Sequence, residues 1–248
     1  MPIVFLSPST QDWNPYVTGS GSEEYWMNRI VDAMEPYLQS NGIPYRRNDP
    51  DTSAGAAIRE ANSGYYDFYL ALHSNAIGNG SAQTSARGII AFYYPGSAGG
   101  QRGAELIAKN LREIYPLPDK VTTRPTTALG EVSRSRFPAV LVEIGYHDNE
   151  ADARWIESHI DAIGQNLAMS MAEYFGLPFT YPGPSQPGVI VTESGGPVNL
   201  RAEPSVTGRV LTRIPSGETV TVFGQYRGWY VVLYGDTLGY VSAPYVQI

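Results

Sequence analysis

Apolar runs of strand length alternate with helical segments through residues 3–175 of the chain. Strands that alternate with helices are typical of an α/β domain whose sheet is mainly parallel and flanked by helices. We therefore predict such a domain for residues 1–177. Its predicted strands cover residues 3–6, 45–48, 69–73, 88–94 and 137–143, and its predicted helices cover residues 23–38, 54–62, 101–114 and 151–175.

The pattern changes after residue 177. Residues 178–188 are rich in proline and glycine with few long apolar side chains, which is the composition of a semi-rigid linker. Residues 189–248 then contain short β-rich runs separated by Gly, Ser and Pro turns, and this spacing predicts a small all-β barrel. The predicted strands of the barrel are residues 189–191, 198–200, 209–211, 219–223, 229–233 and 238–241.

Two of the predicted strands end in side chains that can do chemistry. An apolar run from Tyr69 delivers His73 to its end, before a predicted loop over residues 75–81, and the run from Phe137 ends in Glu143. Open α/β sheets carry ligands and catalytic groups at the carboxyl ends of their strands, so we expect both side chains at one edge. From its position alone, His73 has two interpretations, a hydrogen-bonded corner residue or a functional residue.

The first predicted helix opens with two acidic residues. We expect Ser22 as its N-cap, with Glu23 and Glu24 in the first turn. Carboxylates at this position commonly interact with the helix dipole. The loop before this helix, residues 7–15, is rich in Ser, Pro and Asn and is a candidate wall of a site.

Composition narrows the chemistry that the chain can perform. The 248 residues include no cysteine, which excludes thiolate ligands, thiol nucleophiles and disulfides and leaves His, carboxylate or amide oxygen for any metal site. The formal net charge of −7 offers no basic surface for nucleic acid and argues against an anionic membrane as a partner. No apolar run approaches the length of a membrane span, and the N-terminus lacks the features of a signal peptide.

Two sets of motifs occur along the chain. The first set is Glu24 with Asn28, Arg59–Asn62, Leu72–Ala76, Gly88–Tyr94, Leu129–Val132 and Pro138–Asn149, and the second set is Val198–Arg201, Pro204, Ile214–Gly217, Gly228–Trp229 and Leu238–Val241. Through the first set, residues 3–176 resemble the catalytic domain of zinc-dependent N-acetylmuramoyl-L-alanine amidases of the type-3 family. Through the second set, residues 189–248 resemble a bacterial SH3-like domain. The pairing is typical of cell-wall lytic enzymes and phage endolysins.

The resemblance implies a peptidoglycan hydrolase that cleaves the amide bond between N-acetylmuramic acid and the L-alanine of the stem peptide. It implies that His73 and Glu24 bind Zn²⁺, and that Glu143 is the general base acting on a zinc-bound water. It also implies that the barrel binds the cell wall, with peptidoglycan as the partner. We expect such an enzyme, lacking a signal peptide, to stay in the cytoplasm until lysis or to be exported by another route.

One position departs from the pattern of the amidase family. The family carries a further histidine ligand after the first strand, whereas this chain has Thr10 and Gln11 there. A neutral oxygen is a weak ligand of Zn²⁺. His147, in the loop after the strand of Glu143, is a candidate replacement ligand, and its alternative role is to cap the following helix.

Two alternatives to a zinc amidase stay open. The first is a non-catalytic wall-binding protein, in which the missing histidine has disabled the site. The second is a glycosidase with paired carboxylates, which is weakened because Glu143 has no equally placed acidic partner outside the metal scheme.

Other residues carry weaker signals. Glu131, in a predicted loop, is expected as an exposed acid or as a hydrogen-bond partner of a metal ligand. His159 is expected in mid-helix at the surface. Aromatic residues of the barrel are candidates for a groove that holds peptide or glycan, although Trp229 is also a candidate core residue; they are Tyr226, Trp229, Tyr230 and Tyr240.

Overall fold

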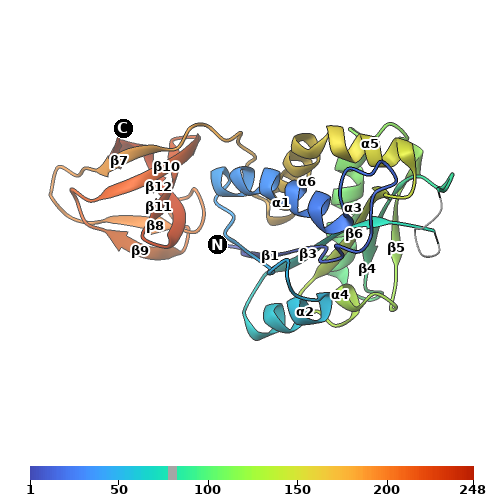
Figure 1. Ribbon diagram of the computed structural model, residues 1–248. Coiled ribbons are helices and arrows are strands. Elements are labelled where there is room, and N and C mark those ends of the chain that lie inside the picture. The colour runs from blue at the N-terminus through green and yellow to red at the C-terminus, as the bar shows by residue number, and fades with distance from the viewer. Residues whose placement is uncertain (78–82) are drawn as a thin grey trace. The chain divides into compact units, whose positions relative to one another are not determined.

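The computed structural model describes residues 1–77 and 83–248, and these divide into two compact units. The larger unit comprises residues 3–35 and 45–174, and the smaller unit comprises residues 1–2, 36–44 and 175–248. The larger unit is a sheet covered by helices, and the smaller unit is built mainly from strands (Figure 1). No helix within the described residues is long and apolar enough to cross a membrane. The predicted loop over residues 75–81 lies partly outside the described residues.

The larger unit is organised around a six-stranded sheet with the order β2-β1-β3-β6-β4-β5. Neighbouring strands are parallel except at β4 and β6, which pair antiparallel. The predicted mainly parallel sheet is therefore confirmed. The strands are β1 Val4–Pro8, β2 Tyr45–Arg47, β3 Phe68–Asn75, β4 Ile89–Tyr93, β5 Val121–Pro125 and β6 Ala139–Tyr146.

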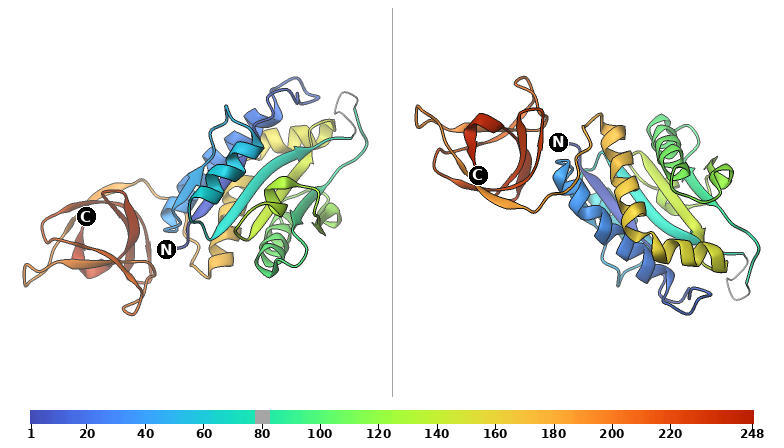
Figure 2. Two further views of the ribbon diagram at one scale, coloured as in Figure 1. Left: turned by 90° about the horizontal axis from the view of Figure 1, so that it is seen from below. Right: turned by 90° about the horizontal axis from the view of Figure 1, so that it is seen from above.

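Helices cover both faces of this sheet (Figure 2). Side chains alternate between the two faces of a strand, so each face can pack against its own helices. On one face, Phe5, Tyr69 and Leu141 pack in a cluster with apolar residues of α2 and α4. The other face lies under α1, α3 and α6 (Figures 1 and 2). The helices are α1 Glu23–Ser40, α2 Ala54–Ser63, α3 Ala98–Arg112, α4 Gly130–Ser133, α5 Glu150–Ser158 and α6 Ile160–Phe175, with a 3₁₀ turn η1 at Pro118–Lys120.

The strand β5 is an element that the sequence pattern does not predict. It lies at the edge of the sheet and pairs with β4. Most of its residues are polar and at least partly exposed, and only Val121 is buried. An edge strand needs little apolar surface, so its sequence resembles that of a loop.

The predicted helix over residues 151–175 is two helices. The C-cap of α5 is His159, whose ring stacks on Trp155 and whose Nδ1 lies 2.9 Å from the Trp155 carbonyl oxygen. His159 therefore lies at a helix junction and not in mid-helix, because its ring contacts the preceding turn and the chain starts a new helix at Ile160.

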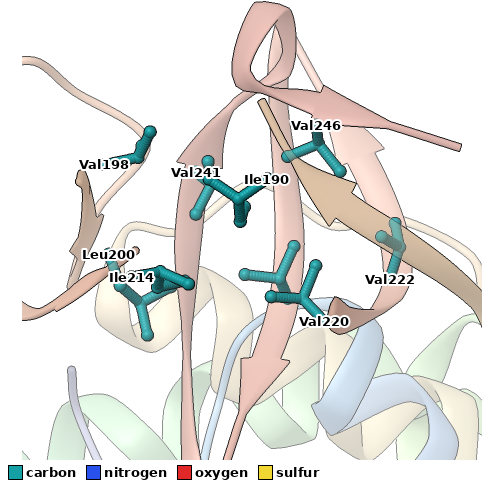
Figure 3. Packing of buried hydrophobic residues seen from close by; sticks show 9 residues of the cluster. Ile190, Val198, Leu200, Ile214, Val220, Val222, Val241 and Val246 are labelled. Carbon is teal, nitrogen blue, oxygen red and sulfur yellow. The ribbon is translucent and has the colours of Figure 1, made fainter. Parts of the chain in front are cut away.

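The smaller unit contains a seven-stranded antiparallel sheet with the order β13-β7-β10-β11-β12-β8-β9. Alternate side chains meet in one apolar core that includes Ile190, Leu200 and Val241 (Figure 3). The predicted all-β, SH3-like fold is confirmed, and each predicted strand is present. The strands are β7 Gln186–Ile190, β8 Val198–Arg201, β9 Val210–Ile214, β10 Thr219–Tyr226, β11 Trp229–Tyr234, β12 Thr237–Ser242 and β13 Val246–Gln247, with a 3₁₀ turn η2 at Ala243–Tyr245.

Candidate functional site

The candidate site lies where β3 and β6 end side by side. His73 of β3 is the register partner of Glu143 of β6, and the two strands are parallel. Register partners point to the same face of a sheet, so both side chains emerge at one edge, as their positions in the sequence predict. This face is the one that α2 and α4 cover, because Tyr69 and Leu141 lie on it and are separated from His73 and Glu143 by an even number of residues.

His73 is held between two buried carboxylates. Its Nδ1 lies 2.8 Å from Oε1 of Glu23, and its Nε2 lies 2.7 Å from Oε2 of Glu131. The other oxygen of Glu131 accepts hydrogen bonds from the hydroxyls of Ser7, at 2.6 Å, and Tyr69, at 2.8 Å. Both nitrogens of the imidazole are therefore engaged, and the ring orientation is fixed from both sides.

Glu131 is a residue for which the sequence leaves two interpretations open, an exposed acid or a hydrogen-bond partner of a metal ligand. It belongs to the short helix α4 and is 4% exposed, so it is not an exposed acid. Its contact with His73 corresponds to the other expectation, a hydrogen-bond partner of a ligand. Val132 beside it is also buried. An acidic residue next to an apolar core residue was the signal in the sequence that could have indicated the burial of Glu131.

Glu23, and not Glu24, reaches His73. Glu23 is 2% exposed and contacts Nδ1, whereas Glu24 is half-buried and its Oε1 accepts a hydrogen bond from Asn28. Successive residues of an α-helix point about 100° apart, so only one of two adjacent acids can face the site. The carboxylate that contacts His73 is therefore Glu23, one residue before the Glu24 that the resemblance implies as a ligand.

His147 does not join this cluster. Its Nδ1 lies 2.9 Å from the carbonyl oxygen of Ser74 and 3.1 Å from the Ser74 hydroxyl, and its ring stacks on Tyr16. Ser74 follows His73 in the strand, so its side chain points to the opposite face of the sheet. The ring of His147 is therefore engaged at a buried corner with Ser74 and Tyr16, and it makes no contact with His73 among the described residues.

The charges of the cluster stabilise one another. Burial alone would lower the pKa of His73, but the hydrogen bonds and charges of Glu131 and Glu23 outweigh it and hold that pKa well above its usual range. Burial raises the pKa of Glu23 and of Glu131, yet the interaction with His73 dominates and leaves the pKa of each carboxyl below its usual range. These interactions favour the protonated form of the imidazole and the ionised form of the two carboxyl groups.

Glu143 is the carboxyl group without a partner. Its Oε2 is buried and makes no hydrogen bond to the described residues. Removal from water raises the pKa of Glu143 to about 7; the charge of His73 opposes this shift, and the charges of Glu23 and Glu131 add to it. A carboxyl with this pKa exchanges a proton near neutral pH, as a general acid or base must.

This pKa predicts a pH-dependent stability. A carboxyl whose folded-state pKa is raised binds a proton more tightly in the folded protein, so stability is lost as pH rises from about 4.5 to 7. The free energy of unfolding should fall between pH 5 and pH 8 in the wild type. In Glu143→Gln, which has no carboxyl to titrate at this position, the fall should be smaller by about 2 to 3 kcal/mol. Urea unfolding in EDTA at the two pH values measures this difference, and equal losses in both proteins would contradict it.

The residues that could hold a metal ion are His73, Glu23 and a neutral amide. Among residues 1–77 and 83–248, no group of three or more His, Cys, Asp or Glu side chains is arranged to hold a metal ion. However, Nε2 of Gln11 lies 3.3 Å from Oε1 of Glu23 and 3.4 Å from Nδ1 of His73. Two buried carboxyl groups, Glu23 and Glu131, contact the imidazole of His73, and the half-buried Glu143 beside it in the sheet has an oxygen without a hydrogen-bond partner among the described residues. This surplus of negative charge fits a cation.

Comparison of sequences places this site in a known family. Residues 11–173 match the family model described as N-acetylmuramoyl-L-alanine amidase, and residues 196–247 match the model described as bacterial SH3 domain. No curated protein matches the chain in sequence.

Solved structures share the fold of the larger unit. The catalytic domain of CwlV, an N-acetylmuramoyl-L-alanine amidase from Bacillus (Paenibacillus) polymyxa var. colistinus, superposes with a TM-score of 0.61 at 16% identity, covering 72% of this chain and 100% of that one. The amidase AmiC2 of Nostoc punctiforme has a TM-score of 0.59 at 15% identity, with coverages of 71% and 97%. The amidase Ami1 from Mycobacterium smegmatis has a TM-score of 0.59 at 14% identity, with the same coverages. These structures establish the fold.

Proposed function

Because the chain belongs to the N-acetylmuramoyl-L-alanine amidase family, we propose that it cleaves the amide bond between N-acetylmuramic acid and the L-alanine of the stem peptide. The observation that carries the proposal is the pair formed by His73 and Glu143 at the ends of adjacent parallel strands, with a buried unpaired oxygen on Glu143. Amide hydrolysis needs a group that takes a proton from water and another that supports charge on the carbonyl oxygen. The arrangement of the site supports both requirements.

The cation that we propose for the site is Zn²⁺, with His73 and Glu23 among its ligands. When bound, it supplies a Lewis acid that polarises the amide carbonyl and makes water more acidic. Glu131 accepts a hydrogen bond from the Nε2–H group of His73 and fixes the plane of the ring, so that Nδ1, once it has lost its proton, would face the cation. This function of Glu131 agrees with its burial and its fixed contacts to Ser7 and Tyr69.

Glu143 is proposed as the general base and then the general acid. As a carboxylate it accepts a proton from the attacking water, and as a carboxylic acid it returns that proton to the nitrogen of the leaving L-alanine. Its raised pKa, about 7, suits both steps because neither protonation state is strongly favoured at neutral pH. Its single carboxyl group can serve both steps because water attacks the same carbonyl carbon from which the nitrogen leaves.

The smaller unit is proposed to hold the enzyme on the cell wall. It contains a groove of about 820 Å³ whose wall includes Trp229, Pro244 and Tyr245. Tyr245 is 44% exposed and Trp229 is half-buried, so their rings are available to a peptide or sugar. Tyr240, in contrast, is fully buried and donates a hydrogen bond to the carbonyl oxygen of Asn41, so it does not belong to a groove.

Removal of the groove tryptophan is expected to weaken binding to the wall. Truncating a central aromatic anchor commonly costs more than about 1 kcal/mol, so Trp229→Ala should bind isolated peptidoglycan about tenfold more weakly than the wild type. Co-sedimentation with purified cell walls measures the change. Tyr65→Ala, which removes an exposed aromatic ring of the larger unit, is the control and should bind as the wild type does.

The products of digestion test the proposed activity. Purified protein with added Zn²⁺ should release stem peptides from cell walls, and new free amino groups of L-alanine should appear in equal number. New reducing sugar ends without amino groups would identify a glycosidase and contradict the proposal. Binding to walls with neither product would identify a non-catalytic wall-binding protein, the alternative that the missing histidine suggests.

A further inference from the structure

Three side-chain atoms at the site form a compact triangle. Nδ1 of His73, Oε1 of Glu23 and the terminal nitrogen of Gln11 are separated by 2.8, 3.3 and 3.4 Å. Ligands at about 2.0 to 2.2 Å from a tetrahedral zinc ion lie about 3.3 Å from one another. The triangle therefore has nearly the size of one face of a zinc coordination sphere, and Gln11 occupies its third corner.

We propose that Gln11 is the third protein ligand of the cation, and that it binds through its amide oxygen where the family has histidine. This inference rests on the proposed function for the identity of the metal, but it concerns only metal binding. It adds a ligand outside the His, Cys, Asp and Glu set.

The loop of Gln11 is anchored against the start of α1. The backbone amide of Gln11 donates to the Ser9 hydroxyl, and its carbonyl oxygen accepts from the amides of Asn14 and Glu24. The carbonyl oxygen of Asn14 in turn accepts from the amide of Glu23. These bonds fix the loop to the helix turn that carries Glu23, so the side chain of Gln11 is positioned beside that carboxylate before a metal arrives.

The amide of Gln11 has two states with different chemistry. In the free protein its NH₂ group donates to Glu23, and its oxygen accepts a hydrogen bond from Asn14 at 3.1 Å. A half-turn of the amide places its oxygen at the corner of the triangle that its nitrogen occupied. A hydrogen-bond donor is thereby replaced by an oxygen that can bind a metal ion. The exchange breaks the bond to Asn14, so metal binding is opposed by a hydrogen bond of the free state.

The affinity and selectivity of the site follow from this arrangement. An amide oxygen is a weaker ligand for zinc than an imidazole nitrogen, and a site with one nitrogen and two oxygens favours hard cations more than a site with two nitrogens. We expect Gln11→His to bind Zn²⁺ at least about tenfold more tightly than the wild type and to raise the ratio of Zn²⁺ to Mn²⁺ affinity. We expect Gln11→Leu, which keeps the size and removes the oxygen, to bind Zn²⁺ at least about tenfold more weakly.

Metal titrations of the full chain test the inference without an activity assay. Dissociation constants for Zn²⁺ and Mn²⁺ are measured by competition with a chelator, and the visible spectrum of the Co²⁺-loaded protein reports the donor atoms. Gln101→Leu, at an exposed glutamine of α3 that bonds Glu105, is the matched control and should leave both constants unchanged. Thermal unfolding in EDTA shows whether each variant is folded, and Gln11→His serves alone if Gln11→Leu does not fold.

Two results would overturn the inference. One is a folded Gln11→Leu with the zinc affinity and the Co²⁺ spectrum of the wild type. The other is a Gln11→His protein whose spectrum and Zn²⁺ to Mn²⁺ ratio do not change. Zinc bound through Gln11 without release of stem peptides would contradict only the proposed function. Hydrolysis by the wild type together with an unchanged Zn²⁺ dissociation constant in Gln11→Leu would contradict only this inference.

Discussion

Replacing Glu143 by glutamine should reduce the rate of stem-peptide release by a factor of about 10² to 10⁴, the range that general acid–base catalysis contributes. The glutamine has nearly the same shape but cannot take a proton from water or return one to the leaving nitrogen. Zinc binding should change little, because His73 and Glu23 are unaltered. Release of L-alanine amino groups from purified walls at neutral pH measures the effect.

Glu24→Gln is the matched control for this variant. It makes the same substitution at a neighbouring acid that faces Asn28 and not the site, so its rate should stay close to that of the wild type. If Glu24→Gln lost as much activity as Glu143→Gln, the assignment of Glu23 and not Glu24 to the site would be wrong. If neither variant lost activity, catalysis would not depend on a carboxylate general base at this edge of the sheet.

Replacing His73 by alanine should have the second large effect, on metal binding and on stability together. The variant removes a proposed ligand, so we expect no stoichiometric zinc and no detectable hydrolysis. It also leaves Glu23 and Glu131 buried without their cationic partner, and breaking a buried pair in this way commonly costs about 3 to 5 kcal/mol. Metal analysis after dialysis and urea unfolding in EDTA at pH 7 measure the two effects.

His147→Gln separates the two buried histidines. His147 bonds to Ser74 on the other face of β3, so its replacement should leave the zinc content at the level of the wild type. The assignment would be reversed if His147→Gln lost the metal while His73→Ala retained it. Because the unfolding measurements are made in EDTA, a loss of stability in either variant is separated from a loss of zinc.

The resemblance to the family places a histidine after the first strand, where this chain has Thr10 and Gln11. The imidazole of His73 is held by carboxylates on both sides, and the Gln11 amide lies 3.4 Å from its Nδ1. An amide is as neutral as an imidazole, so this exchange leaves the charge of the site unchanged. The negative charge around the ring comes from Glu23 and Glu131, together with Glu143 when it is ionised.

The sequence alone determined most of the elements and the residues at the ends of β3 and β6, although it missed the edge strand β5 and the junction between α5 and α6. Apolar runs must be buried, and the carboxyl ends of parallel strands share one edge, so the pattern by itself places His73 and Glu143 together. The acidic start of α1 and the all-β pattern of residues 189–248 were readable for the same reason. These features depend on local periodicity, which the sequence contains directly.

Only the tertiary structure decided which side chains meet. His73 contacts Glu23, 50 residues before it, and Glu131, 58 residues after it, and neither partner follows from local pattern. A rotation of one residue along α1 separates Glu23 from Glu24, and a step of one residue along β3 puts the contacts of His147 on the opposite face from His73. The local pattern indicates which face of each element is buried only to within one residue. The packing of α1 and α4 on the sheet determines which side chains come into contact.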